Sequence, residues 1–272
     1  AEDGIRDIGV TGVQTCALPI SDEPAATAAA LSVIANLRAW LAAPSPEPVI
    51  EIDADLRPEG RNGVLVRTLE SYAVYFEQRS AAWEAQAMLR ARHIAGDADL
   101  GGRWESMIAG IRWPAAGMDE AGVREIRRIK ARVESERLPR GVDPAAHLKL
   151  GPGGLSDVEW TAQLLQLRHA GAKTRLRGTS TLEVLQEALL AGLISEPDER
   201  ALAAAWRGCT MLRNRLVLLT GVTSDVFPGD VTNLRALAHV MKAASPQALR
   251  EEHLRLRRRA RTVMERLFYG RA

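Results

Sequence analysis

The sequence predicts a mainly α-helical protein, with a short α+β region before about residue 140 and a helical bundle after it. Two observations support this prediction. Ala, Leu, Arg and Glu are abundant, while aromatic residues make up only 4% of the chain, a composition that favours helices. Apolar residues recur at helical spacing over most of the chain, and strand-like segments occur only between about residues 49 and 68.

Residues 1–20 are set aside from this prediction. Back-translated into codons, AEDGIRD and VTGVQTCALPI resemble two pieces of a sequencing-library adapter, in order and in one reading frame. We therefore expect them to be a translated assembly artefact, and we place the first native residue at about Ser21. The remaining chain has 35 Lys and Arg against 31 Asp and Glu, a net charge of +4.

The next part of the chain predicts a helix, two short strands and a second helix. The first helix, Glu23 to Leu41, should end at the proline-rich APSPEP, because proline cannot continue the helical hydrogen bonds. VIEIDADLRP is the best strand candidate, EGRNG is a turn, and LVRT is a short return strand. Thr68 is the expected N-cap of the helix that begins LESYAVYFE.

Beyond this region the apolar period predicts helices almost to the end of the chain. WEAQAMLRARHIAGD is helical or mixed. A charged amphipathic helix over residues 120–136 precedes a loop rich in Pro and Gly, LPRGVDPAAHLKLGPGG. The other expected helices span residues 97–113, 156–169, 181–191, 198–219, 231–242 and 246–268.

Asp53, Asp55 and Arg57 alternate along the predicted strand and therefore share one of its faces. Two neighbouring carboxylates repel each other unless a cation lies between them, and magnesium accepts carboxylate and phosphate oxygens together. A solvated strand face with a salt bridge to Arg57 explains the same pattern, and an isolated Asp-x-Asp is common. The residues alone leave both interpretations open, and the second is the more frequent.

The segment KLGPGGLSDVEW predicts a helix that begins directly after three glycines. Ser156 and Glu159 fit a capping box, which places the start of the helix at Ser156. The turn can hold an anion such as a phosphate on free helix N–H groups, or it can be only a tight, capped turn between two domains. The tight turn is the more frequent outcome, and the acidic Asp157 and Glu159 count against a phosphate.

Arg90 and Arg92 follow Glu84 closely and are the remaining candidates for binding a ligand. Such arginines either clamp a triphosphate or balance nearby acidic groups. The five histidines lack metal-ligand spacing, and no Ser/His/Asp pattern supports nucleophilic catalysis. The basic LRLRRRARTVMERLF interleaves arginine with apolar residues at helical spacing, which favours a packed helix with a solvated basic face.

Cysteine content, hydropathy and charge exclude several classes of protein. With Cys16 set aside, Cys209 is the single cysteine, so a disulfide within the chain and a cysteine-based zinc site are excluded, and a cytoplasmic location fits. No run of about 18 uncharged apolar residues predicts a membrane span. A net charge of +4 without a block of like charge or interleaved aromatic residues argues against a nucleic-acid-binding protein.

Two longer segments together resemble one family. LRPEGRNGVLVRTLESYAVYFEQRSAAWEAQAMLRARHIAGD resembles the later part of the nucleotidyltransferase domain of glutamine synthetase adenylyltransferases, and LKLGPGGLSDVEWTAQLLQL resembles the signature of their helical domain. The likeness covers Asp22 to Gly270 and implies a truncated α+β nucleotidyltransferase domain of the polymerase-β type before a helical bundle. REIRRIKARVESERLPRG and the chain end after RTVMERLFYG resemble the C-terminal, adenylylating half of the actinobacterial type.

The resemblance implies an activity and a metal site. Family members transfer AMP from ATP to a tyrosine of glutamine synthetase, with magnesium bound by three carboxylates. Asp53 matches the third carboxylate and is the expected catalytic metal ligand, whereas Asp55 lies at a variable position. The candidate partners for the nucleotide phosphates are Arg57, Arg90 and Arg92.

The Gly-Ser and Asp-x-Asp that supply the first two metal ligands in the family do not occur between Ser21 and Ala272. We therefore expect this chain by itself to be inactive. The resulting division is non-native residues 1–20, a partial nucleotidyltransferase domain 21–113, a connecting helix and loop 114–154, and a bundle 155–272 that should fold by itself.

An interaction module is the alternative of a different class. In this interpretation the helical bundle chiefly docks glutamine synthetase or a PII-type signalling protein. It is compatible with an adenylyltransferase, because both functions can reside in one longer protein. Partner binding by the bundle alone would distinguish the two interpretations.

Overall fold

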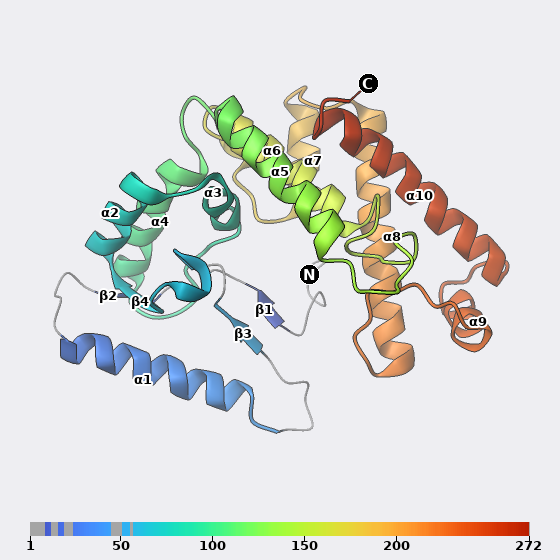
Figure 1. Cartoon of the computed structure of the whole chain (residues 1–272). Coiled ribbons are helices and arrows are strands. Elements are labelled where there is room, and N and C mark those ends of the chain that lie inside the picture. The colour runs from blue at the N-terminus through green and yellow to red at the C-terminus, as the bar shows by residue number, and fades with distance from the viewer. Residues whose placement is uncertain (1–8, 12–15, 19–23, 45–50, 55–56, 272) are drawn as a thin grey trace.

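Figure 1 shows the computed structural model of the chain, in which two groups of helices lie on either side of a central helix, α5 (Glu120–Glu136). The structure describes residues 9–11, 16–18, 24–44, 51–54 and 57–271. Helices make up most of these residues and strands only a few. The mainly α-helical fold that the sequence predicts is therefore confirmed.

The N-terminal region, defined here as residues 24–113, combines helices with very short strands. Parallel pairs join β1 to β3 and β2 to β4, and Thr11 on β1 lies opposite Asp53 on β3. Strands β1 and β2 fall within residues 1–20, which the sequence analysis left out of the fold. The elements up to residue 113 are β1 (Gly9–Thr11), β2 (Cys16–Leu18), α1 (Pro24–Leu41), β3 (Glu51–Asp53), η1 (Gly60–Asn62), β4 (Val66–Thr68), α2 (Leu69–Arg79), α3 (Ala82–Met88) and α4 (Ala98–Arg112).

The helical bundle, defined here as residues 119–271, begins with α5 and ends with the long helix α10. Figure 1 shows α8 and α10 crossing on the side of the molecule away from α1. The elements after α5 are α6 (Leu155–His169), η2 (Thr174–Leu176), α7 (Thr181–Leu190), α8 (Glu196–Thr220), α9 (Val231–Val240) and α10 (Pro246–Leu267).

Side-chain caps explain where several helices begin. The Thr68 hydroxyl accepts a hydrogen bond from the Ser71 amide at 3.1 Å, so the N-cap predicted for α2 is confirmed. The predicted bounds of α5 are confirmed, and Asp119 caps that helix. Helix α8 begins two residues before the predicted Asp198, because Ser195 caps it and Pro197 is tolerated in its first turn.

Three hydrophobic clusters fill the bundle and its junction with the N-terminal region. Two of them lie among the bundle helices, the first built around Trp206 and the second around Phe227. The third joins α3 to α5, α6 and α10 and includes Leu89, Ile126 and Phe268. Helix α5 is therefore part of the bundle core, although the sequence analysis placed it in a connecting segment.

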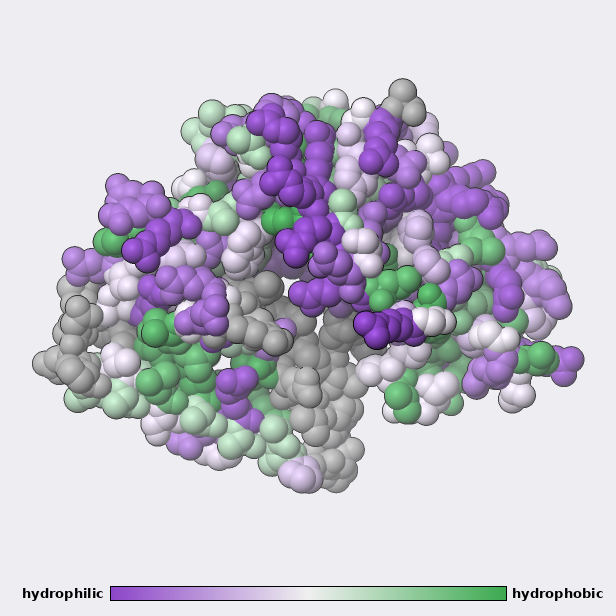
Figure 2. Space-filling view, in the orientation of Figure 1, coloured by the Kyte–Doolittle hydropathy of each residue, from purple (hydrophilic) through white to green (hydrophobic). Residues whose placement is uncertain are grey.

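The N-terminal region has a smaller cluster of its own, built around the ring of Tyr72 and the side chains of Trp104 and Ile108. In Figure 2, green hydrophobic residues reach the surface between α1 and the helices above it, whereas purple hydrophilic residues cover α5. Burial of apolar side chains is thus less complete around α1 than around α5.

Candidate functional site

Asp53 ends strand β3, and its side chain is exposed. Ala54, which follows it, is 5% exposed and anchors the end of the strand in the protein. Asp55 lies outside the described residues, so the structure does not show whether the two carboxylates share a face. Within the described ranges, no group of three or more His, Cys, Asp or Glu side chains could hold a metal ion.

Arg57 stabilises the loop that follows β3. Its Nε donates to the carbonyl oxygen of Gly63 at 2.8 Å, and its Nη1 donates to the carbonyl oxygen of Ala54 at 2.7 Å. A Cβ atom at Gly63 would lie 1.9 Å from the Pro58 oxygen, so only glycine allows this close approach. These contacts give Arg57 a structural role in the segment LRPEGRNG.

Tyr75 hydrogen-bonds to the same loop and is itself held in place by Glu84. The Tyr75 hydroxyl donates to Glu84 Oε1 at 2.7 Å and accepts from the Glu59 amide at 3.2 Å. Burial of the ring and the neighbouring Glu84 raise the pKa of Tyr75. Glu84 is 2% exposed, and its second oxygen accepts from the Ala81 amide at 2.8 Å. Glu84 therefore fixes the start of α3 and does not pair with Arg90.

Arg90 and Arg92 follow the end of α3 and have different surroundings. Arg90 Nη2 donates to Thr181 Oγ1 at 2.9 Å, and its Nε lies 3.1 Å from Glu159 Oε1. Arg90 therefore connects the N-terminal region to α6 and α7. Arg92 is exposed, and it has no hydrogen bond or ion pair to the described part of the chain.

The glycine-rich turn before α6 is a packed structural turn. The amides of Leu155 and Ser156 donate to the carbonyl oxygens of Leu148 and Lys149 at 3.0 and 2.9 Å. Gly153 has φ +68°, and a Cβ there would lie 1.9 Å from the carbonyl oxygen of Arg257 on α10. Because the first amides of α6 already have acceptors, the alternative of an anion bound to them is wrong.

The predicted cap of α6 is also wrong. Helix α6 begins at Leu155 with Gly154 as N-cap, and Ser156 lies buried inside its first turn. The capping group is Asp157, whose Oδ2 accepts from the Gly153 amide at 2.7 Å. Asp157 occupies the third helical position and reaches back beyond the N-cap Gly154 to the Gly153 amide, an amide that the predicted pairing of Ser156 with Glu159 did not involve.

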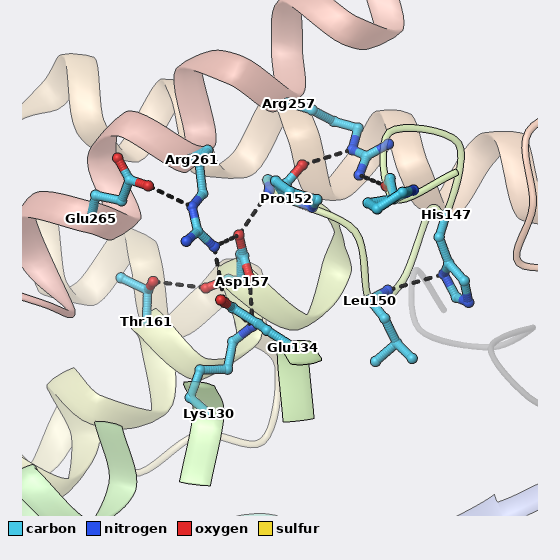
Figure 3. A network of polar contacts seen from close by, with 12 residues as sticks. Lys130, Glu134, His147, Leu150, Pro152, Asp157, Thr161, Arg257, Arg261 and Glu265 are labelled. Carbon is cyan, nitrogen blue, oxygen red and sulfur yellow. Dashed lines mark hydrogen bonds and ion pairs between the residues drawn. The ribbon is translucent and has the colours of Figure 1, made fainter. Parts of the chain in front are cut away.

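Asp157 is the centre of a buried ionic network that joins three helices (Figure 3). Its Oδ1 lies 2.6 Å from Lys130 Nζ on α5, and its Oδ2 lies 3.0 Å from Arg261 Nη1 on α10. Asp157 and Lys130 are each 0% exposed. Glu134 completes the network, with both cations at 2.9 Å from its Oε1. Burial alone raises the pKa of Glu134, but hydrogen bonds from Arg261 and Lys130 outweigh it and lower the net pKa.

Arg257 stabilises the other side of the turn (Figure 3). It is 2% exposed, its Nε donates to the Pro152 carbonyl oxygen at 3.1 Å, and its Nη1 donates to that of Ala145. His253 lies next to it, and burial together with the nearby guanidinium lowers the pKa of His253 to about 3. Sequence reasoning missed this cluster, because Arg257 follows the helical period of a basic helix and its carbonyl acceptors are distant in sequence.

Two family models and several known proteins match this chain. Residues 19–107 match the family model described as glutamate-ammonia ligase adenylyltransferase, and residues 126–268, more than half of the chain, match the model described as GlnD PII-uridylyltransferase. A Streptomyces coelicolor protein named bifunctional glutamine synthetase adenylyltransferase/adenylyl-removing enzyme is 51% identical over 244 residues, or 89% of this chain and 24% of that protein. The chain belongs to the glutamine synthetase adenylyltransferase family.

Family members from other species show the same coverage. The Mycobacterium avium protein of the same name is 48% identical over 252 residues, which is 92% of this chain and 25% of that protein. The Cutibacterium acnes protein is 44% identical over 269 residues, which is 98% of this chain and 27% of that protein. The chain thus spans about a quarter of the length of these relatives. Residues 1–20 lie mostly within the C. acnes alignment and mostly outside the first family model.

Two further features of the described residues bear on function. None of the helices among the described residues combines the length and the apolar character that crossing a membrane requires. Cys209, in the middle of α8, is a free and buried thiol, and burial raises its pKa to about 12. The thiol is therefore neutral near pH 7 and acts as an apolar core group.

Proposed function

We propose that the chain is part of an enzyme that transfers AMP from ATP to a tyrosine of glutamine synthetase. The observation that supports this proposal is the 51% identity, over 89% of the chain, to a protein whose name states that activity. That name contains two activities, and we assign this chain to the half that adds AMP. This assignment rests on the resemblance of the α5 segment to that half. The cytoplasm, which contains ATP and keeps thiols such as Cys209 reduced, is the proposed compartment.

Asp53 is the proposed metal ligand of this chain. Its exposed position at the end of β3 suits a carboxylate that binds magnesium together with phosphate oxygens. The described residues provide no complete set of metal ligands, and the family resemblance implies that the other two carboxylates belong to a part of the relatives that this chain does not span. On its own, the chain should therefore be inactive.

The three candidate arginines do not suit phosphate binding equally. Arg57 and Arg90 donate to groups of the protein itself, and losing those hydrogen bonds would cost stability. Arg92 is exposed and makes no such contact. Arg92 is therefore the strongest of the three candidates for a nucleotide phosphate, and Arg57 and Arg90 act first by positioning their own segments.

The test is a pair of substitutions in a chimera in which this chain replaces the matching segment of the Streptomyces coelicolor relative. Asp53→Asn should abolish transfer of AMP to glutamine synthetase without changing the fold, because it removes one negative metal ligand at constant shape. Asp55→Asn should reduce the rate much less. Equal losses for both variants, or activity that survives Asp53→Asn, would refute the assignment of Asp53.

Docking of a partner by the helical bundle is a second proposal for the same longer protein. The observation that favours it is the exposed apolar surface at the end of α8, where Leu218 is 71% exposed and Val222 is 64% exposed. Glutamine synthetase is the first candidate partner and a PII-type protein the second. Binding of each purified partner to this chain would show which of them the bundle recognises.

A further inference from the structure

The outward face of α8 carries an alternating stripe of basic and apolar side chains. Arg207, Met211, Arg215 and Leu218 follow each other at intervals of three or four residues, which places them on one side of the helix, and Val222 lies just beyond the helix end at Thr220. All five are exposed, although the helix around them contributes Leu212 and Leu216 to the core. We call these five residues the α8 stripe.

The apolar members of the α8 stripe are unusually accessible. Met211 is 49% exposed, Leu218 is 71% exposed and Val222 is 64% exposed. Figure 1 shows the C-terminal end of α8 projecting past the helices packed around its upper part. Single exposed apolar residues are ordinary on protein surfaces, but Met211 and Leu218 on one face of α8, with Val222 just beyond the helix end, form a grouping typical of an interaction surface.

The arginines of the α8 stripe lack acidic partners. Residues 200–224 contain no Asp or Glu, and neither Arg207 nor Arg215 has an ion pair within the described part of the chain. Arg213, on the inward side of the same helix, instead pairs with Asp225. A surface that complements the α8 stripe therefore has carboxylates beside an apolar centre.

A second copy of the chain does not provide that complement. A two-fold contact centred on Met211 would place Arg207 of one copy against Arg215 of the other, and vice versa. Like charges in contact oppose association, and residues 200–224 contain no acid to compensate them. An anionic membrane would gain only two arginine contacts from this narrow face, which is too few for stable attachment.

We infer that the α8 stripe is a docking surface for an acidic, partly apolar patch of glutamine synthetase. The inference rests on the proposed function, and it deepens that proposal by assigning partner recognition to a specific face of the bundle. Met211 and Leu218 provide the apolar contact, while Arg207 and Arg215 on either side of Met211 provide charge complementarity. Arginine suits this role because it pairs with carboxylates through two parallel hydrogen bonds.

The test measures binding of the full 272-residue chain to purified glutamine synthetase of Streptomyces coelicolor, at two salt concentrations. The parent chain should bind, and Arg207→Glu/Arg215→Glu should weaken binding at least tenfold and remove most of its salt dependence. Met211→Ser/Leu218→Ser should also weaken binding at least tenfold, with the salt dependence retained. All four positions are exposed, so unchanged melting temperatures would show that the variants fold.

Two matched controls lie on other helices. Leu190→Ser changes an apolar side chain that is 66% exposed on α7, and Arg132→Glu reverses an arginine whose side chain is 69% exposed on α5. Both should bind like the parent chain. Equal weakening by the controls would overturn the inference, because it would indicate a general charge or solubility effect.

The other outcomes are equally decisive. If the parent chain and the stripe variants bind equally, docking uses another face and the inference is wrong, while the proposed function stands. If the parent chain does not bind, the inference is also wrong, and AMP transfer by the chimera then decides the proposed function independently. Self-association, or binding to vesicles with anionic lipid, that is lost in the stripe variants would assign the α8 stripe to a different occupant and overturn the inference.

Discussion

Helices α1 and α6 are similar in length but differ sharply in burial. None of the described side chains of α1 is buried, and its Trp40 is 77% exposed. In α6, ten of fifteen residues are buried, including Val158 and Leu167 at 0% exposure. Helix α6 packs among α3, α7, α8 and α10, whereas the main contacts of α1 within the described residues are with the short strands β2, β3 and β4. The comparison shows that tertiary packing, more than helix propensity, separates the stable part of this molecule from its periphery.

Buried charges differ between the two regions in a similar way. In the N-terminal region, Glu84 binds a hydroxyl and an amide, and Arg112 donates to the carbonyl oxygens of Met88 and Ala91. In the bundle, Lys130 and Asp157 form an ion pair at 0% exposure. Buried ion pairs are costly to break, because the remaining charge loses both its partner and water. The bundle should therefore respond more strongly to loss of a single charge.

The largest expected effect comes from Asp157→Asn. This change leaves Lys130 and Arg261 with less negative charge in a buried site, and we expect it to lower the free energy of unfolding by about 3–5 kcal/mol. Urea denaturation of the variant and the parent chain would measure the difference.

Asp230→Asn is the matched control for this substitution. Asp230 caps α9 at an exposed position, and asparagine caps helices about as well as aspartate, so denaturation should be unchanged. Similar losses for the two variants would contradict the special role assigned to the buried network. A small loss for Asp157→Asn alone would do the same.

As the pH falls, the bundle should lose folding stability at pH values above those at which its carboxylates are protonated. The pKa of His253 is lowered to about 3, by burial and by Arg257, so the unfolded chain binds a proton below pH 6.5 that the folded chain does not bind. Stability should therefore fall as the pH drops through this window, by about 2 kcal/mol between pH 7 and pH 5 for this histidine. Buried His147, whose pKa is also lowered by burial, adds in the same direction.

A His253→Gln variant tests this assignment, because glutamine does not titrate. Its stability should depend less on pH between 7 and 5 than that of the parent chain. The exposed His239→Gln should keep the parent's dependence. The lowered pKa of Glu134 affects stability only at lower pH, so it does not interfere in this window. An unchanged slope in His253→Gln would refute the role of His253.

The difference between the two regions also explains what the sequence could predict. Local signals sufficed for the bounds of α5 and for the Thr68 cap, because apolar period and capping act within a few residues. They failed at the start of α6, where Asp157 and the backbone of Arg257 on α10 decide the geometry. Lys130 illustrates the limit of such local signals. It lies one turn after Ile126 on the apolar face of α5, and its partner Asp157 is distant in sequence.

The candidate site shows the same limit. The sequence placed Asp53 in a strand that continues to Arg57, but β3 ends at Asp53 and Arg57 lies in the loop that follows, where it donates to the carbonyl oxygens of Ala54 and Gly63. The sequence offered Arg57 and Arg90 as phosphate partners, because it could not show that backbone carbonyls and Glu159 already engage them. Hydrogen bonds that close a loop or bridge two regions depend on the whole fold.

A pair of tryptophan substitutions would sharpen the comparison between the regions. Trp206, in the bundle core, is 4% exposed, and Trp206→Ala should cost about 3–5 kcal/mol through the cavity it leaves. Trp40→Ala on α1 should cost less than about 0.5 kcal/mol, because the side chain is already mostly in water. Thermal unfolding of both variants would measure this. A loss above about 1 kcal/mol for Trp40→Ala would show that α1 is anchored more firmly than its exposure indicates.

The smallest effect is expected from removing residues 1–20. We propose that these residues are foreign to the fold, although β1 and β2 each pair with a strand of the N-terminal region over three residues. Parallel pairs of this length are marginal by themselves, so the melting temperature should stay within about 1 °C of the parent value. Thr68→Ala provides a scale, since loss of this cap should cost about 1 kcal/mol, or about 2–4 °C in a chain of this size. If the deletion lowered the melting temperature by more than Thr68→Ala does, β1 and β2 would be genuine supports of β3 and β4. Residues 1–20 would then belong to the folded protein.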